Sequence, residues 1–124
     1  MEDLEKLILG YYERMVDNKG RFIVPEKFQI DEVYYLKYKD KCLIFYPKKY
    51  YLAVFKKYLE KSELDEERTA FFSAVKIKLD SKKRMQIPSD IRDKLEVKPN
   101  EKVKLLGHGN CFIMVQDSYK KFFK

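Results

Sequence analysis

The sequence predicts a mainly β protein with short helices, an α+β fold in which two related halves form one core. Short β-rich runs alternate with turn residues along the chain. The length of 124 residues suits one compact domain. Two segments also recur in the same order, and each copy, at about 50 residues, is too small to bury a stable core alone. We therefore expect two pseudo-symmetric halves that interlock around a pseudo-two-fold axis.

The repeat rests on two pairs of matching segments. The first pair is YERMVDNKGRFIVPEKF at 12–28 and VKIKLDSKKRMQIPSDI at 75–91, and the second is KCLIFYPKKY at 41–50 and NCFIMVQDSY at 110–119. Both members of the first pair contain the pattern D-x-x-x-R. Two separate matches in one order argue against chance similarity.

Each copy begins with a β-rich run that ends at an aspartate, whose side chain favours a turn. A short strand follows, and proline ends it. The predicted strand, turn and strand are 11–16, 17–20 and 22–24 in the first copy, and 74–79, 80–83 and 85–87 in the second. Ser89 after Pro88 predicts a short helix over 89–95.

A second hairpin follows in each copy. The predicted strand pairs are 33–38 with 42–46 and 102–106 with 111–115. Pro47 and the 3–4 spacing of apolar residues as far as Leu59 predict a helix, and a further helix over 63–73 links the copies. The predicted organisation is a first repeat with its C-terminal helix at 9–62, the linking helix at 63–73 and a second repeat at 74–124.

Composition and charge narrow the function. Lys and Arg number 27 against 20 Asp and Glu, a net charge of +7, and residues 76–84 contain five bases and one acid. This balance favours contact with a polyanion, although a merely solubilising basic surface explains the composition equally well. No stretch has the length of a bilayer span or the pattern of a secretory signal. We therefore expect a cytoplasmic protein that keeps Cys42 and Cys111 reduced.

The sequence shows no grouping of acid, base and nucleophile and no metal-ligand spacing. The expectation is a protein that is not an enzyme, with no cofactor, no metal and no small-molecule substrate.

Each repeated turn carries basic residues before and after its bend. A β-ribbon can enter the major groove of DNA, where Arg pairs with guanine and Lys contacts phosphate. The candidate DNA-contacting residues are Arg14, Lys19, Arg21, Lys82, Lys83 and Arg84, and the candidate turn organisers are Asp17, Gly20 and Asp80. Ion pairs between Asp and Arg that face solvent within each turn are the alternative explanation of the same spacing.

The segment GYYERMVDNKGRFIVPEKF resembles the opening of MraZ-family proteins, and RTAFFSAVKIKLDSKKRMQIPSDIR and LLGHGNCFIMV resemble parts of that family's second half. RMQIPSDIR is also similar to the β-hairpin segment of AbrB-type transcription factors. The resemblance implies two swapped-hairpin, SpoVT-AbrB-like halves. It also implies a nucleoid-associated regulator that binds direct repeats in the promoter of the division and cell-wall gene cluster, and a homo-oligomer in the form of a ring.

Two other classes of function stay open. An AbrB-type antitoxin predicts a long acidic tail, and SYKKFFK at the end of the sequence argues against it. A non-DNA oligomeric scaffold, or an RNA-binding module that uses the tyrosines near the first hairpin, predicts no preference for duplex promoter DNA.

Overall fold

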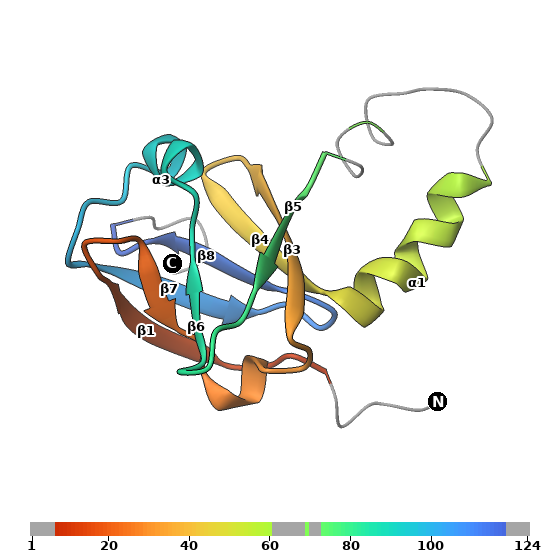
Figure 1. Cartoon of the computed structure of the whole chain (residues 1–124), viewed down its shortest axis with the longest axis horizontal. Coiled ribbons are helices and arrows are strands. Elements are labelled where there is room, and N and C mark those ends of the chain that lie inside the picture. Colours follow the sequence, from red (N-terminus) through yellow and green to blue (C-terminus); the bar gives the residue numbers. More distant parts are fainter. Residues whose placement is uncertain (1–6, 61–68, 70–72, 119–124) are drawn as a thin grey trace.

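The computed structural model describes residues 7–60, 69 and 73–118 (Figure 1). Within them the protein is mainly β with short helices, which confirms the α+β class. The strands are β1 (Tyr11–Val16), β2 (Arg21–Ile23), β3 (Val33–Lys39), β4 (Cys42–Pro47), β5 (Val75–Lys78), β6 (Arg84–Gln86), β7 (Glu101–Gly107) and β8 (Phe112–Gln116). The helices are the 3-10 helix η2 (Glu26–Phe28), α1 (Lys48–Leu59) and α3 (Ser89–Leu95).

The predicted strands and the helices after Pro47 and Pro88 are present, with their ends within one residue of the prediction. The 3-10 helix η2 was not predicted, because a single turn after Pro25 is too short to show a helical period. The predicted helix at 63–73 lies outside the described residues, except for Thr69, which is helical, and Ser73, which lies in a turn.

Six strands form one antiparallel sheet in the order β1-β7-β8-β4-β3-β5, and β2 and β6 form a separate two-stranded ribbon. Strands of the two repeats pair with each other, since β1 of the first pairs with β7 of the second, while β5 of the second pairs with β3 of the first. Equivalent strands also pair with each other. Ile44 of β4 lies opposite Ile113 of β8, and Phe22 of β2 lies opposite Met85 of β6. Each half of the sheet therefore contains strands of both copies.

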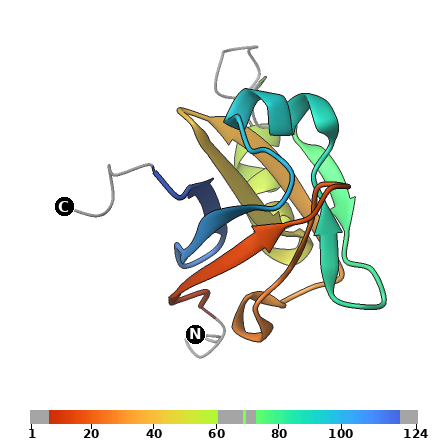
Figure 2. The same cartoon turned by 90° about the vertical axis from the view of Figure 1, so that its left-hand side faces the viewer.

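The core fills the space between the ribbon and one face of the sheet. Phe22 and Met85 of the ribbon are 1% exposed and belong to the same cluster as Phe45 and Phe112 of the sheet. The Phe22 and Phe45 rings meet edge to face, with centroids 5.5 Å apart. Helix α3 lies at one end of the sheet, as the view turned by 90° shows (Figure 2). Burial of the inner side chains of β2 and β6 holds the ribbon on the sheet.

Helix α1 packs on the opposite face of the sheet through its first turn. Tyr51 is buried, and its ring stacks on that of Tyr35, with centroids 4.4 Å apart, and lies 5.8 Å from that of Tyr46. The remainder of α1 points away from the sheet (Figure 1). These three tyrosine rings are packed against one another, with Tyr51 buried and Tyr35 and Tyr46 partly exposed. In the described part of the chain, no helix has the length and apolar character needed to cross a membrane.

Candidate nucleic-acid interface

The ribbon of β2 and β6 presents an outward surface because its residues alternate between core and solvent. Phe22 and Met85 point inward, so their neighbours on both strands point outward. Across the ribbon Arg21 lies opposite Gln86, and Ile23 lies opposite Arg84. We name the ribbon face as these outward residues with the lysines of the two adjoining loops: Lys19, Arg21, Ile23, Lys82, Lys83, Arg84 and Gln86.

The first loop is organised by the carboxylate of Asp17. Its Oδ1 accepts hydrogen bonds from the backbone N–H groups of Lys19 at 2.9 Å and Arg21 at 2.8 Å. Its Oδ2 accepts a bond from Nε of Arg21 at 2.8 Å. The N–H of Gly20 donates to the carbonyl of Asp17 at 3.0 Å and closes the turn. One short side chain therefore holds both the backbone of the loop and its arginine.

The second loop has the same geometry. Oδ1 of Asp80 accepts bonds from the backbone N–H groups of Lys82 at 2.9 Å and Arg84 at 2.8 Å, and Oδ2 accepts a bond from Nε of Arg84 at 2.9 Å. Lys83 takes the place of the glycine, and its N–H donates to the carbonyl of Asp80 at 3.0 Å. The two D-x-x-x-R segments thus form matching loops.

These bonds keep both aspartates ionised. Burial raises the pKa of Asp17, but the bonds from Arg21 and Lys19 outweigh it, so the pKa lies below the ordinary value. The backbone N–H and guanidinium of Arg84 lower the pKa of Asp80 in the same way. A lowered carboxyl pKa stabilises the fold above the unfolded pKa, and this contribution is lost as the pH falls through the folded pKa. Both ion pairs are therefore intact at neutral pH.

The ion pairs leave the outer part of each guanidinium available. Arg21 and Arg84 bond their aspartates through Nε, and the side chains are 27% and 25% exposed. Among the described residues, the terminal nitrogens of these two arginines have no hydrogen-bond acceptor. A guanidinium held at Nε presents its two outer nitrogens in a fixed direction. The ion-pair explanation and a ligand-binding role are therefore compatible.

Backbone hydrogen bonds join the two loops to one ribbon. The N–H of Val24 donates to the carbonyl of Lys83 at 2.9 Å, and the N–H of Ile87 donates to the carbonyl of Gly20 at 2.9 Å. Gly20 and Val24 flank the three-residue strand β2, so the two loops lie at opposite ends of the ribbon, on the order of 10 Å apart. That separation is close to the ~12 Å width of the major groove of B-DNA.

The charge of the ribbon face is strongly positive. It combines five cations with the two carboxylates that organise the loops, and the side chains of Lys19, Lys82 and Lys83 are exposed. Strands β2 and β6 bring the basic loops of the two copies to one surface.

Arg14, the remaining candidate, lies at the edge of the ribbon. Its Nε donates to the carbonyl of Ile23 at 3.1 Å, and its Nη1 donates to the carbonyl of Glu13 at 2.9 Å. The guanidinium also lies 5.5 Å from the centre of the Tyr12 ring. In this structure Arg14 fastens β1 to β2.

Two residues at the centre of the ribbon face, Ile23 and Gln86, were not among the predicted site residues. Ile23 is 55% exposed, and Gln86 is exposed and donates from Nε2 to the carbonyl of Lys19 at 2.9 Å. The signal that could have found them is the period-two alternation around Phe22 and Met85.

Comparison with known proteins identifies the family. The transcriptional regulator MraZ of Finegoldia magna is 30% identical over 113 residues, which are 84% of this chain and 77% of that protein. The chain belongs to the MraZ family. No model of a protein family matches it. A protein of Pyrococcus horikoshii with a known solution structure covers 91% of the chain, and the chain covers 98% of it, at 16% identity and a TM-score of 0.40, from which no shared fold is inferred.

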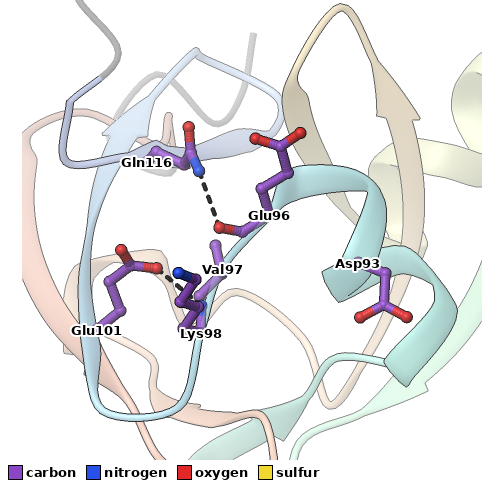
Figure 3. A pocket seen from close by; sticks show the side chains of 6 residues that line it. All are labelled: Asp93, Glu96, Val97, Lys98, Glu101 and Gln116. Carbon is purple, nitrogen blue, oxygen red and sulfur yellow. Dashed lines mark hydrogen bonds between the residues drawn. The ribbon is translucent and has the colours of Figure 1, made fainter.

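Outside the ribbon face, this MraZ-family chain has an open pocket of about 500 Å³ between α3 and β7 (Figure 3). The N–H of Lys98 donates to Oε1 of Glu101 at 2.7 Å, and Nε2 of Gln116 donates to the carbonyl of Glu96 at 2.9 Å. Asp93 adds a further carboxylate to the lining. No group of His, Cys, Asp and Glu within the described ranges is arranged to hold a metal ion. The contacts fasten the loop that leads into β7.

Gly20 and Lys83 occupy equivalent left-handed positions, with φ of 80° and 63°, and should respond oppositely to substitution. A Cβ at Gly20 would collide with the guanidinium of Arg92. We expect Gly20→Ala to lower the free energy of unfolding by about 1–2 kcal/mol, and Lys83→Gly to raise it by about 0.5–1 kcal/mol, because only glycine adopts this conformation without strain. Urea unfolding monitored by circular dichroism measures both changes.

The matched control is Lys82→Gly, the neighbouring exposed lysine, which does not have a positive φ. This variant should be slightly less stable than the native protein, because glycine adds only unfolded-state entropy there. Equal losses for the Lys82 and Lys83 variants would contradict the strain argument.

Proposed function

We propose that this protein is a transcriptional regulator that binds double-stranded DNA in a sequence-specific manner through the ribbon face, and that it is not an enzyme. The observation that carries the proposal is the pair of matching D-x-x-x-R loops on one ribbon. Each loop presents an oriented guanidinium beside exposed lysines. The family supports the regulatory part, since the relative from Finegoldia magna is named a transcriptional regulator.

The chemistry of the ribbon face suits a DNA duplex. Two outer nitrogens of a guanidinium match O6 and N7 of guanine, and ammonium groups suit phosphate oxygens. The ion pair with aspartate restrains each arginine before binding, so less side-chain freedom is lost on contact. We propose that Arg21 and Arg84 contact bases, and that Lys19, Lys82 and Lys83 contact phosphates. No cofactor or small-molecule substrate is required.

We also propose that the chain consists of two pseudo-symmetric, swapped-hairpin, SpoVT-AbrB-like halves, at 9–62 and 74–124. The exchange of β1 and β5 between the copies supports this arrangement. So do the symmetric pairs at the centre, Ile44 with Ile113 and Phe22 with Met85.

Helix α1 supports a homo-oligomer, for which we propose a ring. Most of α1 points away from the sheet, and Leu52 on it is 44% exposed. Isolated helices of this length are marginal in water, so a partner surface would stabilise α1. Several linked subunits on spaced direct repeats of a promoter would bind more tightly than one subunit on one site. The proposed location is the cytoplasm, in association with the nucleoid.

The test is a binding titration against the DNA upstream of the protein's own gene and a scrambled duplex of equal length, at about 50 mM and 200 mM salt. The native protein should prefer the upstream DNA and lose affinity steeply with salt. A plot of the logarithm of the binding constant against the logarithm of the salt concentration has a negative slope, which is steeper by about 0.9 for each phosphate contact. Lys82→Ala should make that slope less steep by about one and weaken binding to both duplexes alike.

Lys102→Ala is the matched control. It removes the same charge from the opposite face of the sheet, where Lys102 pairs with Glu13 at 3.4 Å, and should leave both affinities unchanged. Equally weak binding of the native protein to both duplexes would contradict the proposed function, since basic charge alone would explain such binding.

A further inference from the structure

The two halves of the ribbon face match in all but a few places. Lys19 and Lys82 are equivalent, as are Arg21 and Arg84, with bond lengths that agree within 0.1 Å. Among the outward residues of β2 and β6, the two copies differ at one position, which is Ile23 in the first copy and Gln86 in the second. Those two residues stand on either side of the centre of the ribbon, in register with the two arginines.

This difference matters because a two-fold symmetric surface would bind a duplex equally well in two opposite directions. The sugar–phosphate backbones do not distinguish the directions, and only base edges do so. Lys83, which replaces Gly20, adds a cation suited to phosphate and cannot read a base. We propose that Ile23 and Gln86 read bases and thereby give the protein one direction on its site. The inference rests on the DNA-binding function proposed above.

Ile23 has the exposure and the position for an apolar base contact. It is 55% exposed on a basic surface and lies directly opposite Arg84. Its backbone is fixed, since its carbonyl accepts the bond from Arg14. In the major groove the 5-methyl group of thymine is the apolar feature that such a side chain can contact.

Gln86 has the chemistry for a polar base contact. The bond from its Nε2 to the carbonyl of Lys19 fixes the amide and uses one of its two hydrogens. The second hydrogen and the amide oxygen have no partner within the described part of the chain. Together they match N7 and the 6-amino group of adenine, the bidentate pairing that glutamine makes. Because the opposite loop holds the amide, the side chain is oriented before DNA arrives.

The register of β2 and β6 then predicts which bases each end of the ribbon face prefers. One end of the ribbon face presents Arg21 beside Gln86, suited to guanine next to adenine. The other presents Ile23 beside Arg84, suited to thymine next to guanine. A site with these two different ends fits in one direction only.

The direction can be measured by local cleavage of DNA. Asn18→Cys places a thiol on the exposed tip of the first loop, and the native Cys42 and Cys111 are only 7% and 5% exposed. An iron–EDTA group attached at position 18 cuts the DNA near that loop. The probe is a duplex with one site, selected by the native sequence from a random pool. We call the Asn18→Cys protein with this group attached the carrier. The carrier with native Ile23 and Gln86 should cut on one side of the site.

Two variants of this carrier test the assignment. Ile23→Gln gives each end of the ribbon face the same pair of base-reading residues, one arginine opposite one glutamine. This variant should give cuts of nearly equal strength on both sides of the site. The exchange Ile23→Gln with Gln86→Ile should move the cuts to the opposite side, with a change in the side-to-side ratio of about 10-fold or more. Ile23→Val, which keeps an apolar side chain, should cut on the original side and shows that a change at this exposed position is tolerated.

Cuts that stay on one side in both glutamine variants would overturn the inference and leave the proposed function standing. So would cuts on both sides by the unexchanged carrier. A native protein that selects no site from the pool would instead overturn the proposed function, and the inference with it.

Discussion

Replacing Phe112 with alanine is expected to lower the free energy of unfolding by about 3–5 kcal/mol, the range for truncation of a buried aromatic residue. The side chain is fully buried. Its ring stacks on Phe45 at 4.6 Å and on Phe28 at 4.9 Å, and it meets Tyr34 edge to face at 6.0 Å. Phe112 belongs to the second sequence repeat and these neighbours to the first, so the substitution removes packing between residues of the two repeats.

Urea denaturation with circular dichroism measures this change. The slope of the free energy against urea should stay near its native value, which indicates that the surface exposed on unfolding is unchanged. Leu52→Ala, at a site 44% exposed on α1, is the control and should change the stability of the isolated chain by no more than about 0.5 kcal/mol. A loss below about 1 kcal/mol for Phe112→Ala would contradict a core centred on this ring.

The double variant Arg21→Ala with Arg84→Ala is expected to lower affinity for the selected DNA by about 30-fold or more, since each base contact contributes ~1–3 kcal/mol. The change removes two guanidinium groups. It also leaves the carboxylates of Asp17 and Asp80 without their side-chain partners on a surface that faces phosphates. A fluorescence titration against the selected duplex and a scrambled one measures the loss of both affinity and preference.

The conservative double variant, lysine at both positions, separates charge from geometry. Lysine keeps the positive charge but lacks the planar pair of outer nitrogens. It should therefore retain most binding to the scrambled duplex and lose the preference for the selected one. Arg14→Ala should have a smaller effect than either double variant, because Arg14 is already bound to backbone carbonyls. Native preference in the alanine double variant would remove Arg21 and Arg84 from the interface.

Much of the fold could be predicted because its signals are local. Aspartate at the start of each turn and the prolines after 24 and 87 gave the ends of β2 and β6 within one residue. The repeat also predicted that equivalent parts would fold alike, and the two loops agree in every hydrogen bond of their aspartates. The single turn η2 escaped because three residues carry no period.

The candidate site could be predicted only in part. The spacing of Asp17 and Arg21 indicated both an ion pair and a ligand contact, and the geometry of Nε shows that one arginine can serve both. The place of Arg14 against the carbonyl of Ile23 depends on how β1 lies beside β2, which no local pattern contains.

By itself, the sequence determined the class of fold and the local structure of the repeated loops, because turn preference and side-chain alternation act over a few residues. Only the tertiary structure decided that β1 pairs with β7 and β5 with β3, since the choice between strands distant in the chain depends on the whole core. It also decided that Ile23 and Gln86 lie on the same outward surface, since β2 and β6 are distant in the chain and pair only in the folded protein. That outcome follows from Phe22 and Met85 being drawn into the same interior, which turns the neighbours of both toward solvent.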